Sequence, residues 1–84
     1  MNFWVHVGDR AKKGLREIPA ADLRRIMAAL ESMRTEPLAG DVTKLKGADG
    51  FRRRFGSYRI LFMIDFERRQ VSVTGILRRT SATY

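Results

Sequence analysis

Three runs of alternating side chains fill most of the second half of the sequence and constrain the fold more than any other feature. They span residues 51–55, 58–66 and 71–78, and short turns of two and four residues separate them. Period-two alternation predicts β-strands, and connections this short can join only antiparallel neighbours. The middle run carries apolar side chains on both faces, for example Ile60 and Leu61, which predicts a central strand covered on both sides. We therefore expect an antiparallel sheet at the centre of the fold.

The first half of the sequence predicts another strand and two helices. Residues 3–7 are rich in aromatic and β-branched side chains, and we expect Asp9 to cap a helix that runs to residue 18. Pro19 separates this helix from a second one, which ends before Pro37. The second helix carries an apolar stripe at helical spacing that we expect to lie in the core: Leu23, Ile26, Met27, Leu30 and Met33. A short strand at residues 42–45 precedes the alternating runs.

Together these elements predict one α+β domain over residues 1–84. Its expected order is β-α-α-β-β-β(-β), with an N-terminal αα-hairpin packed on one face of a mainly antiparallel sheet. At 44% hydrophobic residues the chain is not a disordered tail. It has no cysteine and one histidine, so we expect no disulfide, no metal site and a reducing, cytoplasmic setting. The N-terminus does not resemble a signal peptide, and no apolar run is long enough to span a membrane.

Positive charge is concentrated in the second half of the chain. Of 17 Lys and Arg and nine Asp and Glu, residues 44–84 hold ten and three, whereas residues 1–43 hold seven and six. The formal net charge of +8 thus divides into about +7 and +1. Such an imbalance favours a polyanionic partner, with nucleic acid first, an acidic protein second and an anionic membrane surface third.

Alternation also predicts which arginines converge. Arg52 and Arg54 are two residues apart and share one face of their strand, opposite to the flanking phenylalanines. Arg59 is expected on the same face of the next strand, and Arg78 and Arg79 leave the third strand near the same region. Guanidinium groups bind phosphate oxygens and stack on bases, so we expect a nucleic-acid site here.

Other candidate binding residues flank this cluster. Tyr84, together with Tyr58, would supply an aromatic surface for unstacked bases. Lys44 and Lys46 lie on the side opposite Leu45 and would add backbone contacts. Arg53 is charged, yet alternation places its side chain on the apolar face of the strand. It either extends to the surface at the sheet edge or marks a β-bulge.

These motifs, in their order and spacing, resemble the RelE/ParE toxin superfamily over nearly the whole chain. The resemblance rests on the βαα start and on four segments: Lys44-Leu45-Lys46-Gly47, the run from Phe51 to Ile60 with its Gly-x-Tyr-Arg turn, Ile64-Asp65, and Arg78-Arg79 ahead of Tyr84. It implies a toxin of a type II toxin–antitoxin system. RelE-like members are mRNA endonucleases that act at the ribosomal A site without a metal or other cofactor, through attack of the ribose 2′-OH on the adjacent phosphate.

The resemblance also implies roles for five residues. Arg52 and Arg59 would hold the scissile phosphate, and Arg78 would stabilise charge and protonate the leaving 5′ oxygen. Tyr84 would stack on a base or orient the 2′-OH. Arg54 occupies the position of a basic residue that assists deprotonation. Because arginine stays protonated at ordinary pH, either catalysis is mainly electrostatic with help from the ribosome, or the nuclease is weak.

Two other functions are compatible with the same sequence. A ParE-like protein would inhibit DNA gyrase, although such members generally lack the full arginine–tyrosine set. A non-catalytic RNA- or ribosome-binding module would use the same basic face for affinity alone. In either toxin interpretation we expect a cognate antitoxin as partner in a hetero-oligomer, with an acidic or amphipathic segment laid over the basic face or the helices.

Overall fold

The computed structural model describes residues 2–47 and 49–78, which form two helices and five strands. The elements follow the expected β-α-α-β-β-β-β order. Their bounds are β1 Trp4–Val7, α1 Asp9–Arg16, α2 Ala20–Ser32, β2 Asp41–Lys44, β3 Phe51–Phe55, β4 Tyr58–Asp65 and β5 Gln70–Arg78. In this part of the chain, neither helix has the length and apolar character that crossing a bilayer requires.

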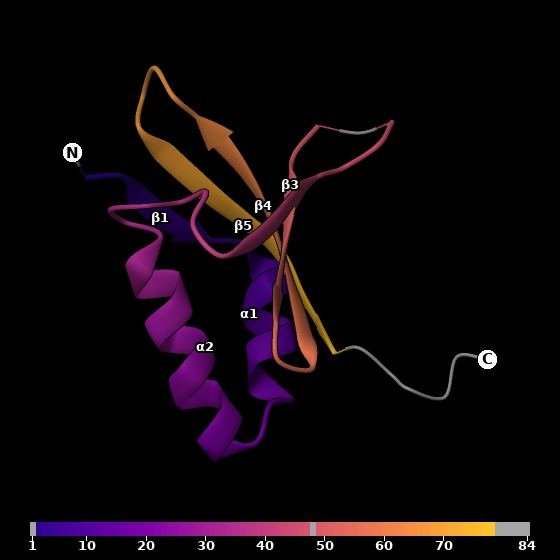
Figure 1. Ribbon diagram of the computed structural model, residues 1–84. Helices are drawn as coiled ribbons and strands as arrows, with labels where there is room; N and C mark the ends of the chain where they lie inside the picture. The colour runs from indigo at the N-terminus through magenta and orange to yellow at the C-terminus, as the bar shows by residue number, and fades with distance from the viewer. Residues whose placement is uncertain (1, 48, 79–84) are drawn as a thin grey trace.

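All five strands belong to one sheet with the order β1-β5-β4-β3-β2 (Figure 1). The strands from β5 to β2 run antiparallel to their neighbours, as the short turns predict. β1 runs parallel to β5, with Trp4 opposite Gln70 and Val7 opposite Val73. The expectation of an α+β fold with a mainly antiparallel sheet is therefore confirmed, and one edge of the sheet is parallel.

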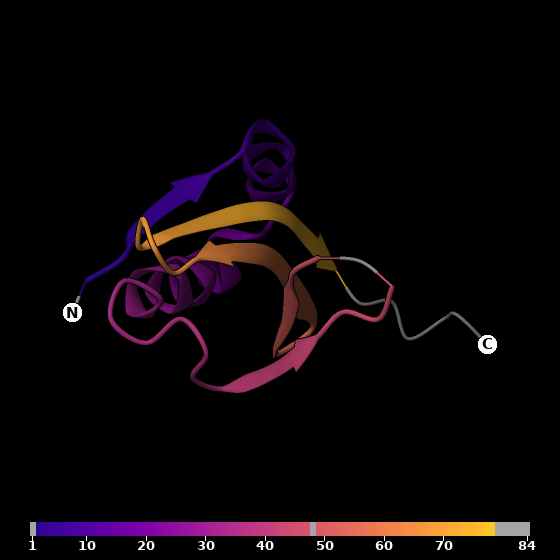
Figure 2. The same ribbon diagram turned by 90° about the horizontal axis from the view of Figure 1, so that it is seen from above.

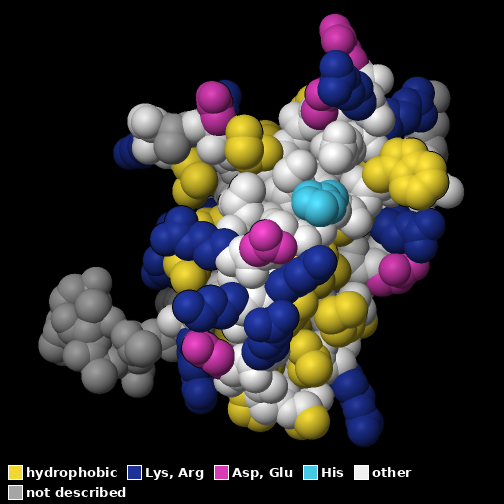
Figure 3. Space-filling view, turned by 180° about the vertical axis from the view of Figure 1, so that it is seen from behind, with side chains coloured by type: hydrophobic (Ala, Val, Ile, Leu, Met, Phe, Trp, Pro, Cys, Tyr) yellow, Lys and Arg dark blue, Asp and Glu magenta, His cyan; other side chains and the backbone are white. Residues whose placement is uncertain are grey.

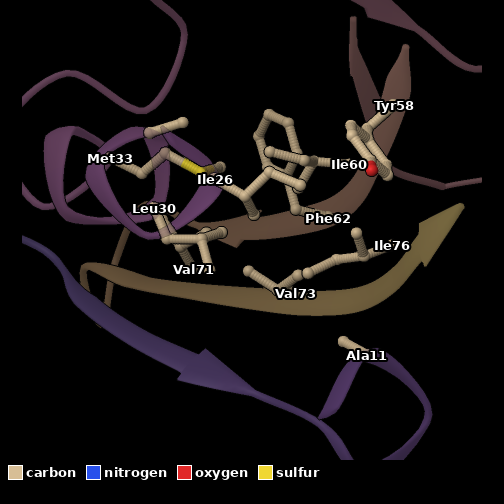
Figure 4. Close-up of a cluster of buried hydrophobic side chains, with 11 residues drawn as sticks. Ala11, Ile26, Leu30, Met33, Tyr58, Ile60, Phe62, Val71, Val73 and Ile76 are labelled. Carbon is tan, nitrogen blue, oxygen red and sulfur yellow. The ribbon is translucent and has the colours of Figure 1, made fainter. Parts of the chain in front are cut away.

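The core lies between α2 and one face of the sheet, which curves around the helix (Figure 2). Side chains from α2 and from the alternate positions of β4 and β5 meet there (Figure 4). The buried set is Ala11, Ile26, Ala29, Leu30, Met33, Tyr58, Ile60, Phe62, Val71, Val73 and Ile76. The helix stripe is confirmed at its centre, but Met27 is 49% exposed and lies outside the core.

Helix α1 lies beside β5, beyond the end of β1 (Figure 2). A Cβ atom added to Gly14 would be 2.5 Å from the Ile76 carbonyl oxygen, so glycine is needed for this close approach. Gly8 occupies the N-cap position without a side-chain cap, and Asp9 is the first helical residue. The expectation that Asp9 caps α1 was therefore wrong by one residue, a common uncertainty at helix ends.

A β-bulge interrupts the pairing of β4 with β5. Leu61 is opposite Gly75, but the next residue, Phe62, is opposite Val73, so Thr74 is an extra residue in β5. The bulge reverses which face each later side chain of β5 occupies. Val73 and Ile76 consequently both reach the core, although they are an odd number of positions apart, with two residues between them.

Candidate anion-binding site

Arg52, Arg54 and Arg59 lie on the face of the sheet that α2 does not cover. In the register of β3 and β4, Arg54 is directly opposite Arg59, and Arg52 is opposite Leu61. The neighbour of Arg59 in β4, Ile60, is fully buried on the other face. The structure therefore brings these three predicted residues together, and we refer to Arg52, Arg54 and Arg59 as the arginine site.

The arginine site has no counter-charge in direct contact within residues 2–47 and 49–78. The two ion pairs found in these residues are i,i+3 contacts at the surface, and neither involves the site. The Nε atoms of Arg52 and Arg59 are shielded from solvent and have no hydrogen-bond partner there. Like charges directly opposite each other, as in Arg54 and Arg59, destabilise a sheet. An anion with several oxygen atoms would relieve both defects, because guanidinium groups donate to phosphate in pairs.

Arg78 does not join the arginine site. It is directly opposite Tyr58, whose side chain is buried toward α2, so Arg78 leaves β5 on the α2 side of the sheet. The expectation placed Arg78 near the other arginines because it leaves the end of the third strand. The bulge at Thr74 shifts the alternation along β5, so Arg78 shares a face with the buried Ile76.

Tyr58 is a core residue rather than a stacking surface. It is 3% exposed, and its hydroxyl donates a 2.8 Å hydrogen bond to Oδ2 of Asp22 at the start of α2. Burial raises the pKa of Tyr58, the Asp22 carboxylate raises it further, and Arg78 partly offsets this rise. The hydrogen bond joins the β3–β4 turn, which precedes Arg59, to α2. Sequence reasoning missed this contact because it is not local.

The predicted lysines and the C-terminal residues are placed as follows. Lys44 is opposite Phe51, so its position in β2 belongs to the α2 side of the sheet and not to the face of the arginine site. Lys46 is exposed in the connection between β2 and β3. Arg79 and Tyr84 lie outside the residues that the structure describes, so their predicted roles remain predictions.

Arg53 reaches the surface from an apolar position. It keeps the alternation of β3 and lies opposite Ile60 on the α2 side. Its Nη1 atom donates a 3.2 Å hydrogen bond to Oγ of Ser32, and its guanidinium carbon is 5.8 Å from the centroid of the Phe55 ring. β3 pairs with both neighbours without a break, so the side chain extends past the core and no bulge is needed.

These features define a class: a small basic α+β protein with a cluster of guanidinium groups on one face of a five-stranded sheet. Comparison with known proteins narrows this class. No family model matches the chain. A curated protein of Methanocaldococcus jannaschii named "Putative toxin RelE1" is 29% identical, and the alignment covers 98% of this chain and 96% of that protein.

Solved structures agree with this similarity. The archaeal RelE–RelB complex from Pyrococcus horikoshii matches with a TM-score of 0.85 and 26% identity, over 98% of this chain and all (100%) of that chain. The RelBE2 toxin–antitoxin complex of Mycobacterium tuberculosis matches with a TM-score of 0.86 and 26% identity, over 94% and 100%. The isolated RelE toxin of E. coli, at 18% identity and a TM-score of 0.73, shares the fold, over 96% of this chain and 88% of that chain. In sequence and in fold, the chain is similar to toxins of the RelE/ParE-type superfamily.

Proposed function

We propose that this protein is the toxin of a toxin–antitoxin pair and that it cleaves mRNA on the ribosome in the cytoplasm. The arginine site is the observation that supports this activity. Three guanidinium groups on adjacent strands, without ion-pair partners among the described residues, form a site for a phosphate group. The superfamily supplies the reaction, in which the ribose 2′-OH is the nucleophile.

In this reaction the 2′ oxygen forms a bond to the adjacent phosphorus, and the bond from phosphorus to the 5′ oxygen breaks. Negative charge develops on the non-bridging phosphate oxygens in the transition state. Arg52 and Arg59 bind these oxygens, and Arg54, opposite Arg59, adds a third positive charge. None of the three can accept the 2′-OH proton, because arginine stays protonated. The protein's part is therefore electrostatic, and the ribosome aligns the RNA and assists proton transfer.

Two further residues were expected to act near the leaving group. In this proposal Tyr84 stacks on a base or orients the 2′-OH, whereas Arg78 leaves the opposite face of the sheet and adds only long-range positive charge. Because Arg78 starts on the α2 side of the sheet, its contribution is smaller than that of Arg59. An Arg78→Ala variant should therefore lose less activity than Arg59→Ala.

The partner in this proposal is a cognate antitoxin. The solved relatives from Pyrococcus horikoshii and Mycobacterium tuberculosis are complexes of a toxin with its antitoxin. A net charge of +8 favours an acidic antitoxin segment. We expect a small open reading frame next to the gene, and its co-expression should yield a stable complex that suppresses toxicity.

The test is cleavage of a defined mRNA by the full-length protein on purified ribosomes. The wild type should produce fragments that end in a 2′,3′-cyclic phosphate, as 2′-OH attack requires. Arg59→Met keeps an apolar stem but removes the charge opposite Arg54, so it should slow cleavage about 100-fold without lowering the free energy of unfolding. Arg24→Ala, on the exposed surface of α2, is the matched control and should cleave normally. Intact mRNA with wild-type protein, or inhibition of DNA gyrase instead, would refute the nuclease function.

A further inference from the structure

A groove of about 350 Å³ lies between α1 and the sheet. One wall comes from a single face of α1, with Arg10 and Lys13, and from the C-cap residue Glu17 that follows the helix. The floor comes from the strands and includes Leu61, Thr74 and Leu77. The superfamily resemblance assigns no role to any of these side chains.

The floor of this groove is continuous with the arginine site. Leu61 in β4 is opposite Arg52 in β3, and Leu77 in β5 is opposite Arg59 in β4. Opposite residues lie on the same face of a sheet, and neighbouring strands are about 5 Å apart. The groove thus begins one strand away from the guanidinium cluster, on the same face.

The chemistry of the groove suits a nucleotide. Its wall carries two exposed cations, Arg10 and Lys13, against one carboxylate, Glu17. Figure 3 shows Lys and Arg side chains gathered over the α1 region, with hydrophobic side chains beside them. The floor is apolar, and Leu77 is 52% exposed. Positive side chains along a backbone and an apolar surface under the bases are the two components of single-strand binding sites.

Size favours RNA over a protein helix as the occupant. An α-helix with its side chains is about 10–12 Å across and rises about 5.4 Å per turn, so a volume of about 350 Å³ holds less than one turn. A volume of about 350 Å³ fits one nucleotide, at the small end of ligand sites. We infer that the groove is a nucleotide subsite, in which Arg10 and Lys13 bind a backbone phosphate and Leu61 and Leu77 lie under the base. This inference rests on the proposed function, because it places the bound nucleotide next to the scissile linkage.

The test uses binding rather than cleavage, so the two proposals can fail separately. The probe is a fluorescein-labelled, five-nucleotide single-stranded RNA, and the readout is fluorescence anisotropy with the full-length protein over a range of salt concentrations. Arg10→Ala/Lys13→Ala removes the groove cations. Lys12→Ala/Arg16→Ala removes two cations from the same helix that do not line the groove, and it serves as the charge-matched control.

The groove variant should bind the RNA about tenfold more weakly, and the slope of log Kd against log salt should fall by about 0.7, the value for one lost phosphate contact on a single strand. The control should keep the wild-type slope. Glu17→Gln should act in the opposite direction and tighten binding by about twofold, because it removes a carboxylate that repels phosphate.

Three results would overturn the inference. Equal losses in both double variants would mean that only overall charge matters. Unchanged RNA binding by the groove variant would show that the groove is empty in the RNA complex. Unchanged RNA binding with loss of antitoxin binding would make the groove a protein-docking site. If the binding difference holds but wild-type protein cleaves no mRNA on ribosomes, the nuclease proposal fails and the nucleotide subsite stands.

Discussion

Arg54 and Arg59 illustrate at the scale of single residues how stability and function conflict in this protein. They place two positive charges opposite each other on adjacent strands, and the shielded Nε of Arg59 has no hydrogen-bond partner among the described residues. Both features cost folding free energy. Such a cost in folding free energy is typical of a ligand-binding site, since a bound phosphate would provide the missing counter-charge.

Alternation alone was enough to predict that Arg52, Arg54 and Arg59 share a face. Each of these arginines lies where β3 pairs with β4 in a regular register, so the alternation of side chains between the two faces is not interrupted. Tyr58 could not be placed in this way. Its expected part in an aromatic surface for bases was wrong, because Tyr58 is buried and its hydroxyl donates to Asp22, 36 residues away in the sequence.

The Tyr58–Asp22 hydrogen bond predicts a specific pH dependence of stability. The pKa of Tyr58 is raised in the folded protein, so its stabilising effect is complete below the unfolded value of about 10 and is lost as the pH rises through the folded pKa. Tyr58→Phe should therefore be less stable than the wild type at pH 8. The difference in unfolding free energy between the two proteins should shrink above about pH 10.

Urea unfolding at several pH values between about 8 and 11 measures this difference. Ionisation of Tyr84 is common to both proteins and cancels. A gap between wild type and Tyr58→Phe that stays constant across this range would contradict the assignment of the hydrogen bond.

At the scale of secondary structure, a β-bulge in β5 determines the face on which Arg78 lies. The strand itself was predicted correctly, but the bulge was not, and it reverses the two faces of the strand after Thr74. Gly75 was the available signal, because a glycine inside a strand pattern often marks a bulge. Parallel pairing of β1 with β5 was not predictable from local pattern, since these strands are joined only through the rest of the fold.

The contact between α1 and β5 predicts the effect of one substitution. Gly14→Ala should destabilise the protein by up to about 2 kcal/mol. The added methyl group meets the Ile76 carbonyl oxygen, so α1 must move away from β5 at a cost of about 1–3 kcal/mol. Alanine offsets about 1 kcal/mol of this cost through its higher helix propensity. Urea unfolding measures the change, with the exposed Lys12→Ala as a control on the same helix. A Gly14→Ala variant more stable than the wild type would contradict the close packing.

At the scale of the whole molecule, the fold brings together basic side chains that are far apart in the sequence. Counted along the chain, the first half is nearly neutral at about +1. In three dimensions, the basic side chains of α1 that line the groove lie next to a floor that adjoins the arginine site. The positive surface is therefore wider than the second half of the sequence predicts, because tertiary packing and not sequence distance decides which charges act together.

The most direct test of the account is the single-turnover rate of mRNA cleavage on ribosomes for wild type, Arg52→Met, Arg59→Met and the double variant. If the two arginines bind one phosphate group as a unit, each single variant should lose about 100-fold, and the double variant should lose far less than the product of the two single losses. A double variant that cleaves the mRNA at the wild-type rate would contradict the central claim that these guanidinium groups hold the reacting phosphate.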